Sequence, residues 1–246
     1  MKHRASSYLA ALIGAVFVAA PVAFADEPRA VIELFTSQGC SSCPPADKLL
    51  GELAKDPSLV MLSLPVDSWD YLGWKDTFAM SAFSDRQRAY AQHVGIRDVY
   101  TPQVVIDGRA QASGAKPAAI EPMLAARAKT RRNPPDMQML GKGRVAVGSG
   151  RVPAGGAEVW LVRYNAQVQQ VAVRRGDNRG QTLDYRNVVR QLIRLGPWAG
   201  KPRAYRVPPP SEGGLSSAIL VQGARGGPMV GAMIISSAET QDAVAH

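Results

Sequence analysis

The sequence contains few of the residues that usually hold metal ions or disulfide frameworks, with two cysteines and three histidines in 246 residues. A structural zinc site generally needs four ligands. After residue 25 the thiols and imidazoles are only Cys40, Cys43, His93 and His246. A disulfide between the two cysteines would close a loop too short to remove much entropy from the unfolded chain. The scarcity therefore argues against structural zinc and a structural disulfide, and it leaves redox exchange or soft-metal binding.

Long hydrophobic runs are also missing, because no stretch approaches the roughly 20 apolar residues that span a bilayer. The apolar run 8–20 follows Lys2 and Arg4 and ends just before Ala23-Phe24-Ala25. This order is typical of a secretory signal peptide, with an uncleaved anchor as the alternative. We predict cleavage after Ala25, export to the periplasm or the outside of the cell, and no stable membrane insertion afterwards.

The charges are distributed unevenly along the chain, whose net charge is +9. Residues 26–125 contain nine Lys/Arg and thirteen Asp/Glu, whereas residues 126–246 contain eighteen and seven. Such asymmetry suggests two units with different surfaces. The arginines of the basic half are scattered among strand-like segments, which favours a solvated basic face, and we predict no nucleic-acid partner.

The first half alternates strand and helix patterns. Residues 30–36 form a buried β-branched and aromatic run, and a helix with prolines in its first turn follows from Pro44. Residues 59–64 form a second apolar strand. Strand, crossover helix and strand make a βαβ unit, which predicts a parallel pair in a buried sheet.

Three further elements complete this half. Ser84-Asp85 opens a predicted helix, and Asp107-Gly108 joins two short extended runs, which predicts a hairpin. A last helix is expected between Lys116 and Arg131, with Pro122 in its first turn or at a kink.

The second half is predicted to be mostly β. A proline pair at Pro134-Pro135 indicates a linker. Short β-prone runs at 145–147, 158–164, 168–173, 183–189, 217–222 and 229–235 are separated by Gly, Pro and Asn. They suggest a sandwich or small barrel, although residues 187–195 also suit a helix face. The predicted fold class is therefore α/β, with a signal peptide at 1–25, a thioredoxin-like domain at 26–132 and a β-rich domain at 133–246.

The two cysteines lie where a strand and loop lead into a helix. Unpaired N–H groups and the positive end of that helix would stabilise a thiolate at Cys40, which we assign as the nucleophile. Cys43, one turn further in, would be the resolving thiol. Ser41 and Ser42 could donate to the Cys40 sulfur, which would favour the reduced form and make the pair more oxidising.

Several segments carry a family resemblance. The strand, the Cys-x-x-Cys at a helix start and the later Thr101-Pro102 resemble the thioredoxin superfamily. The chain is also similar to an exported bacterial thioredoxin-like family of unknown function. That similarity is carried by the following segments: E-L-F-T-S-Q-G-C-S-S-C-P-P-A-D, D-Y-L-G-W-K-D, R-Q-R-A-Y, Y-T-P-Q-V-V-I-D-G, R-G-D-N-R-G, N-V-V-R and L-G-P-W-A-G.

The resemblance implies a role for four residues. Cys40 and Cys43 would form the exchange pair, and Thr101 with a cis Pro102 would align a client backbone. Client thiols or disulfides, or a redox partner, would then be the partners, and no cofactor beyond the Cys40–Cys43 disulfide and no metal would be needed. One departure is Leu34, which stands where thioredoxins place a buried acid that helps to move protons.

Four other residues are candidate accessory groups. Glu33 is an acid inside an apolar strand, and such an acid needs a partner or a purpose. Asp67 and Asp70 could carry protons for Cys43, or they could form turns and caps. Trp69 could line a client groove, or it could pack in the core of a long loop.

The leading functional prediction is an exported thiol–disulfide oxidoreductase acting on protein or small thiol substrates. One alternative is a Cu(I) carrier, because soft thiolates select that ion and Met61 or Met80 could assist. The other alternative is a non-catalytic structural adaptor in which the β-rich half binds a partner.

Overall fold

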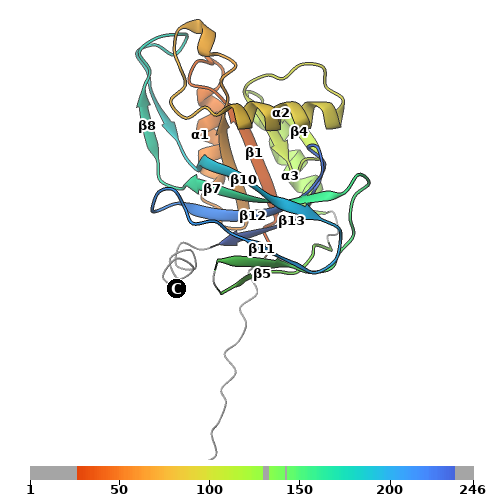
Figure 1. The fold of residues 1–246 in the computed structure, drawn as a ribbon. Coiled ribbons are helices and arrows are strands. Elements are labelled where there is room, and N and C mark those ends of the chain that lie inside the picture. Colours follow the sequence, from red (N-terminus) through yellow and green to blue (C-terminus); the bar gives the residue numbers. More distant parts are fainter. Residues whose placement is uncertain (1–26, 130–132, 142, 236–246) are drawn as a thin grey trace, which may run out of the picture.

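The computed structural model describes residues 27–129, 133–141 and 143–235 (Figure 1). Its strands are β1 (Ala30–Thr36), β2 (Leu59–Pro65), β3 (Gln103–Ile106), β4 (Ala110–Ser113), β5 (Met137–Leu140), β6 (Arg144–Val147), β7 (Ala157–Asn165), β8 (Gln169–Ala172), β9 (Thr182–Tyr185), β10 (Val188–Trp198), β11 (Arg203–Arg206), β12 (Ser216–Gly223) and β13 (Met229–Ile235). Its α-helices are α1 (Pro44–Leu53), α2 (Ser81–Val94) and α3 (Ile120–Ala128). The protein is therefore a mixed α/β structure made mostly of strands.

The predicted signal peptide lies outside the described residues. In the described part of the chain, no helix is both long and apolar enough to cross a membrane.

The largest element is an eight-stranded sheet with strand order β13-β12-β7-β10-β2-β1-β3-β4. Strands β1 and β2 are parallel, with pairs running from Ala30–Leu59 to Thr36–Pro65. Both are buried along their whole length, as expected for a strand covered on both faces. The predicted βαβ unit is confirmed, and α1 begins at Pro44 as predicted.

Alternate residues of β1 face opposite layers. Ile32 and Leu34 pack with α1 and α3 on one face. Val31 and Phe35 pack on the other face with Phe83 of α2. Because side chains alternate along a strand, Glu33 must share the α2 face.

Helix α2 begins at Ser81, three residues before the predicted start. Its N-cap is Met80, which makes no side-chain cap bond. Ser84, expected to open the helix, is buried and donates to Asp67 Oδ1 at 2.6 Å. The cap-like sequence was therefore misleading, because its serine makes a tertiary contact instead.

The predicted hairpin around Asp107-Gly108 is confirmed as β3 and β4. Asp107 and Gly108 both have positive φ, at 50° and 61°. Helix α3 is shorter than predicted because a 3-10 turn at Pro117–Ala119 precedes it, and Pro122 lies in its first turn.

The large sheet takes strands from both sides of the predicted boundary at residue 132. Strand β10 pairs with β2 through Val188 and Ser63, and β7, β12 and β13 continue the sheet beyond it. The segment 187–195, which also suited a helix, is strand from Val188. Residues 130–132 lie outside the described residues, and the division into two domains stays a prediction.

The described β-rich half also contains two smaller sheets. Strands β11, β6 and β5 form a three-stranded sheet, which packs Val145 and Val147 against Val159 and Leu161 of the large sheet. Neither β5 nor β11 was predicted. Strand β11 has arginine at both ends and little apolar character.

The hairpin of β8 and β9 positions the candidate site. It packs beside α1, and an apolar cluster joins its Leu183 and Tyr185 to Trp74 and Phe78. The loop between its strands contains the R-G-D-N-R-G segment, and Asn178 of this loop donates to the Cys40 carbonyl oxygen.

Candidate functional site

The two cysteines lie between the end of β1 and the start of α1, and they are joined by a disulfide. Cys43 is the N-cap of α1, and its N–H donates to the Cys40 carbonyl oxygen at 3.1 Å. Cys40 is 3% exposed and Cys43 is fully buried. Another molecule can therefore reach the Cys40 sulfur only when the groups that cover it move.

The surroundings of the Cys40 sulfur are partly as predicted. Ser42 Oγ lies 3.4 Å from Cys40 Sγ, whereas Ser41 Oγ is directed to Asp177 Oδ2 at 3.5 Å. Pro44 and Pro45, the first residues of α1, have no N–H groups. Fewer helix N–H donors are thus available to a thiolate than the sequence interpretation assumed, and Ser42 is the side chain that contacts the sulfur.

Trp69 connects the cysteine loop to the Thr101–Pro102 bond. Trp69 Nε1 donates to Thr101 Oγ1 at 2.6 Å, and the Thr101–Pro102 bond is cis, as the resemblance implied. A Cβ on Gly39, next to Cys40, would lie 3.0 Å from the Trp69 Cβ. The structure therefore brings Trp69 against the residue before Cys40 and links it to Thr101, the residue before the cis proline.

The other three accessory candidates have partners away from the cysteines. Asp67 accepts from Ser84, and Asp70 Oδ1 accepts from the Asp76 N–H at 3.0 Å. Glu33, which is 1% exposed, pairs with Arg86 of α2 at 2.5 Å and also accepts from Tyr90. Asp67 thus makes a tertiary bond to α2, Asp70 makes a bond within its own loop, and Glu33 lies on the face opposite α1.

Sequence reasoning missed a buried polar network behind the cysteine loop. Asp76 Oδ2 accepts from the Gln38 N–H at 2.7 Å, and Asp76 Oδ1 accepts from the Phe78 N–H at 2.9 Å. The Gln38 side chain accepts from Trp74 Nε1 at 2.8 Å. Burial raises the pKa of Asp76 despite these bonds. The network fixes the backbone two residues before Cys40.

Sequence reasoning also missed Asp47, the fourth residue of α1. Asp47 is 8% exposed and its Oδ2 accepts from Thr36 Oγ1 at 3.0 Å. Burial raises the pKa of this carboxyl well above its usual range. An acid in the first helical turn is common because it complements the helix dipole, so nothing in the local sequence distinguished Asp47 from a surface residue.

Asn178 of the β8–β9 loop is the third missed residue. It is 1% exposed, and its Nδ2 donates to the carbonyl oxygens of Gln38 at 3.0 Å and Cys40 at 2.9 Å. The R-G-D-N-R-G segment, which contributed to the family resemblance, was the available signal. Its contact with the cysteines could not be predicted, since the residues are 138 positions apart.

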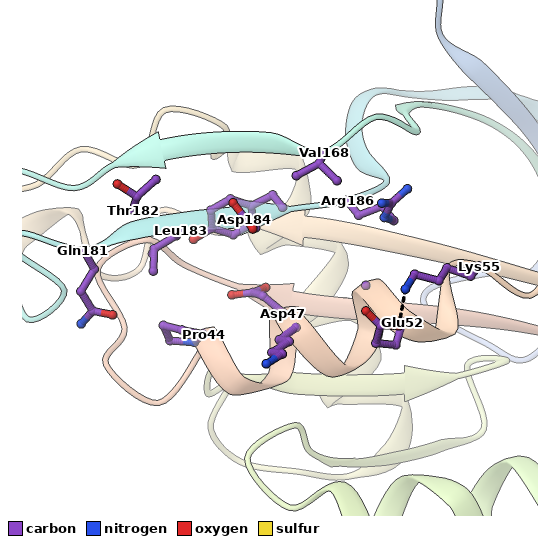
Figure 2. A pocket seen from close by; sticks show the side chains of 13 residues that line it. Pro44, Asp47, Glu52, Lys55, Val168, Gln181, Thr182, Leu183, Asp184 and Arg186 are labelled. Carbon is purple, nitrogen blue, oxygen red and sulfur yellow. Dashed lines mark hydrogen bonds and ion pairs between the residues drawn. The ribbon is translucent and has the colours of Figure 1, made fainter.

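A cavity of about 520 Å³ lies between α1 and the segment Gln181–Arg186 (Figure 2). Asp47, Lys48 and Glu52 line it from the helix, and Asp184 and Tyr185 line it from β9. Burial also raises the pKa of Tyr185. Within the described residues, no group of three or more His, Cys, Asp or Glu is arranged to hold a metal ion.

Comparisons with known proteins give the following relationships. A crystal structure of a protein from Agrobacterium tumefaciens, solved by a structural genomics consortium, is 32% identical, with a TM-score of 0.69 over 86% of this chain and 96% of that chain. HBP35 of Porphyromonas gingivalis is 11% identical, with a TM-score of 0.57 over 88% of this chain and 76% of that chain, which is a likeness of fold alone. No curated protein matches the sequence significantly. The family model described as "Protein of unknown function (DUF1223)" matches residues 31–222, and the chain therefore belongs to that family.

Proposed function

We propose that this protein is an exported thiol–disulfide oxidoreductase, with a thioredoxin-like N-terminal region in which Cys40 and Cys43 are the exchange pair. The observation that carries the proposal is the bonded Cys40–Cys43 pair, which closes the turn between a central strand and the helix behind it. These are the two cysteines of the whole chain, so an exchange within the molecule uses both.

The thioredoxin-like part of the proposal is supported by the order of elements. Strand, helix and strand in β1, α1 and β2 are followed by α2, the β3–β4 hairpin and α3. Strand β1 lies between its parallel partner β2 and its antiparallel partner β3. Ala46 of α1 and Pro102 both approach Gly114, where an added Cβ would lie 2.9 Å and 3.1 Å from their Cβ atoms.

The reaction has two steps. In the reducing direction the Cys40 thiolate attacks a client disulfide, which forms a mixed disulfide and releases one client thiolate. The Cys43 thiolate then attacks the Cys40 sulfur, restores the internal disulfide and releases the second client thiolate. The client gains two electrons and the cysteine pair loses two. The oxidising direction is the reverse.

Trapping of the intermediate tests the proposal. A Cys43→Ala variant, expressed with its N-terminal segment, should accumulate mixed disulfides through Cys40, and a Cys40→Ala variant should not. Equal amounts of adducts in the two variants, or none in either, would contradict the proposal. Tight Cu(I) binding under anaerobic conditions, without disulfide exchange with glutathione, would instead support the alternative function of a Cu(I) carrier.

Export has its own test. The mature protein recovered from the periplasm or medium should begin at Asp26 on N-terminal sequencing. A chain that retains residues 1–25 and is found in the membrane fraction would instead indicate an uncleaved membrane anchor.

A further inference from the structure

Asp47 lies one helical turn after Cys43. Cys43 has helical backbone angles, with φ −77° and ψ −38°, and the Asp47 N–H donates to its carbonyl oxygen at 3.0 Å. Residues four apart on a helix share one face, with Cβ atoms about 5–6 Å apart. Asp47 is therefore stacked directly behind the buried cysteine.

Helix geometry directs the Asp47 side chain toward the turn that begins at Cys43. Helical side chains lean toward the N-terminus of their helix. The hydrogen bond from Thr36, at the end of β1, holds Asp47 Oδ2 in that direction. Thr36 and Leu34 point to the same face of β1, because side chains alternate along a strand. Asp47 of α1 therefore places an acid on the same face of β1 as Leu34, which is apolar.

One carboxylate oxygen remains available. Asp47 Oδ1 is buried, and it has no hydrogen-bond partner among the described residues. An unsatisfied buried carboxylate oxygen is costly, and a catalytic role or a bound water accounts for such a group. Asp47 also lines the 520 Å³ cavity, and Figure 2 shows its carboxylate between α1 and Leu183. Water in that cavity can exchange protons with a group that is otherwise shielded.

We propose that Asp47 exchanges a proton with the Cys43 thiol during disulfide exchange, an inference that rests on the proposed function. In the reducing direction, Cys43–SH gives its proton to the Asp47 carboxylate as its sulfur attacks Cys40 and the client thiolate leaves. The proton then passes from Asp47 to water in the cavity. In the oxidising direction, protonated Asp47 returns a proton to the Cys43 thiolate that is released when a client thiolate attacks Cys40.

The other buried acids of the described chain are engaged elsewhere. Asp76 accepts backbone N–H groups with both oxygens, Asp107 pairs with Arg127, and Glu33 faces α2. The charged and titratable groups that face Asp47 or line its cavity are Asp76, Lys48, Glu52, Lys55, Asp184, Tyr185 and Arg186. Burial makes Asp47 a stronger base than an exposed aspartate, which suits acceptance of a thiol proton.

A two-phase reaction with an aromatic disulfide, 5,5′-dithiobis(2-nitrobenzoic acid), tests the proposal on the reduced mature chain. Attack by Cys40 releases a first coloured thiolate, and resolution by Cys43 releases a second. Asp47→Asn should leave the first phase unchanged and slow the second on the order of 100-fold at neutral pH. Asp85→Asn, which changes an exposed acid of α2 that pairs with Arg88, should leave both phases unchanged.

A second variant tests the same proton transfer if Asp47→Asn does not fold. Thr36→Val removes a donor to the Asp47 carboxylate while keeping the acid, so the pKa that governs the second phase should rise. A second phase with unchanged rate in Asp47→Asn, or an unchanged pH profile in Thr36→Val, would overturn the role of Asp47 and leave the oxidoreductase proposal intact. Absence of both phases in the unmodified chain would overturn both.

Discussion

The side-chain amide of Asn178 donates a hydrogen bond to the carbonyl oxygen of Cys40 at 2.9 Å, across 138 positions of sequence. The same nitrogen also donates to the Gln38 carbonyl oxygen at 3.0 Å. The β-rich part of the chain is thereby attached to the loop that carries the proposed nucleophile. Access to Cys40 is coupled to the position of the β8–β9 loop.

Asn178→Ala should make Cys40 more accessible. Two hydrogen bonds of about 1 kcal/mol each are lost, which should increase the open population and the alkylation rate of reduced Cys40 about 30-fold. Iodoacetamide labelling in a Cys43→Ala background isolates Cys40. Asn165→Ala, which removes only a local bond to the Gln167 N–H, is the control and should leave the rate unchanged. An equal rate in the two variants would mean that the loop does not limit access.

Ser42→Ala should make the cysteine pair less oxidising. Ser42 Oγ is 3.4 Å from Cys40 Sγ and can donate to a thiolate, which stabilises the reduced form. Loss of a bond of about 1 kcal/mol corresponds to a reduction potential lower by about 20 mV, measurable by equilibration with glutathione. Ser41→Ala is the control, because Ser41 is directed to Asp177. A larger change in Ser41→Ala than in Ser42→Ala would contradict this assignment.

Glu33→Ala should destabilise the fold without altering the exchange chemistry. Removal of one partner leaves Arg86 buried and unpaired, which costs about 3–5 kcal/mol. For a chain of this size the loss corresponds to a decrease in Tm of about 6–20 °C, seen by thermal circular dichroism. The double variant Glu33→Leu/Arg86→Met should recover most of the loss. Exchange by the folded fraction should not change, and a selective loss of exchange would mean that Glu33 belongs to the site.

The stability of Asp47→Asn relative to the unmodified protein should depend on pH. The folded-state pKa of Asp47 is raised above its ordinary value of 3.8, because burial disfavours the charged form. The protonated acid is therefore the form that the fold prefers, and this contribution is complete below pH 3.8 and is lost as the pH rises through the folded-state pKa. Urea unfolding from pH 4 to 8 should show Asp47→Asn gaining stability relative to the unmodified protein. A difference independent of pH would contradict the raised pKa.

Much of the fold could be predicted because its patterns are local. The buried runs of β1 and β2, the helix after Pro44-Pro45 and the turn at Asp107-Gly108 all appear where neighbouring residues indicated them. The start of α2 was misplaced because Ser84 makes a tertiary bond to Asp67. Strand β11 was missed because its stability comes from pairing with β6, which no local pattern encodes.

The candidate site also combines features set by the local sequence with features set by tertiary contacts. The sequence by itself determined the two cysteines, the serine pair between them and the helix that follows, because spacing along the chain controls these features. Only the tertiary structure decided which acid lies behind Cys43 and which residue binds the Cys40 carbonyl oxygen. Burial and long-range hydrogen bonding select Asp47 and Asn178 from many similar residues, and both depend on how the sheet, α1 and the β8–β9 hairpin pack together.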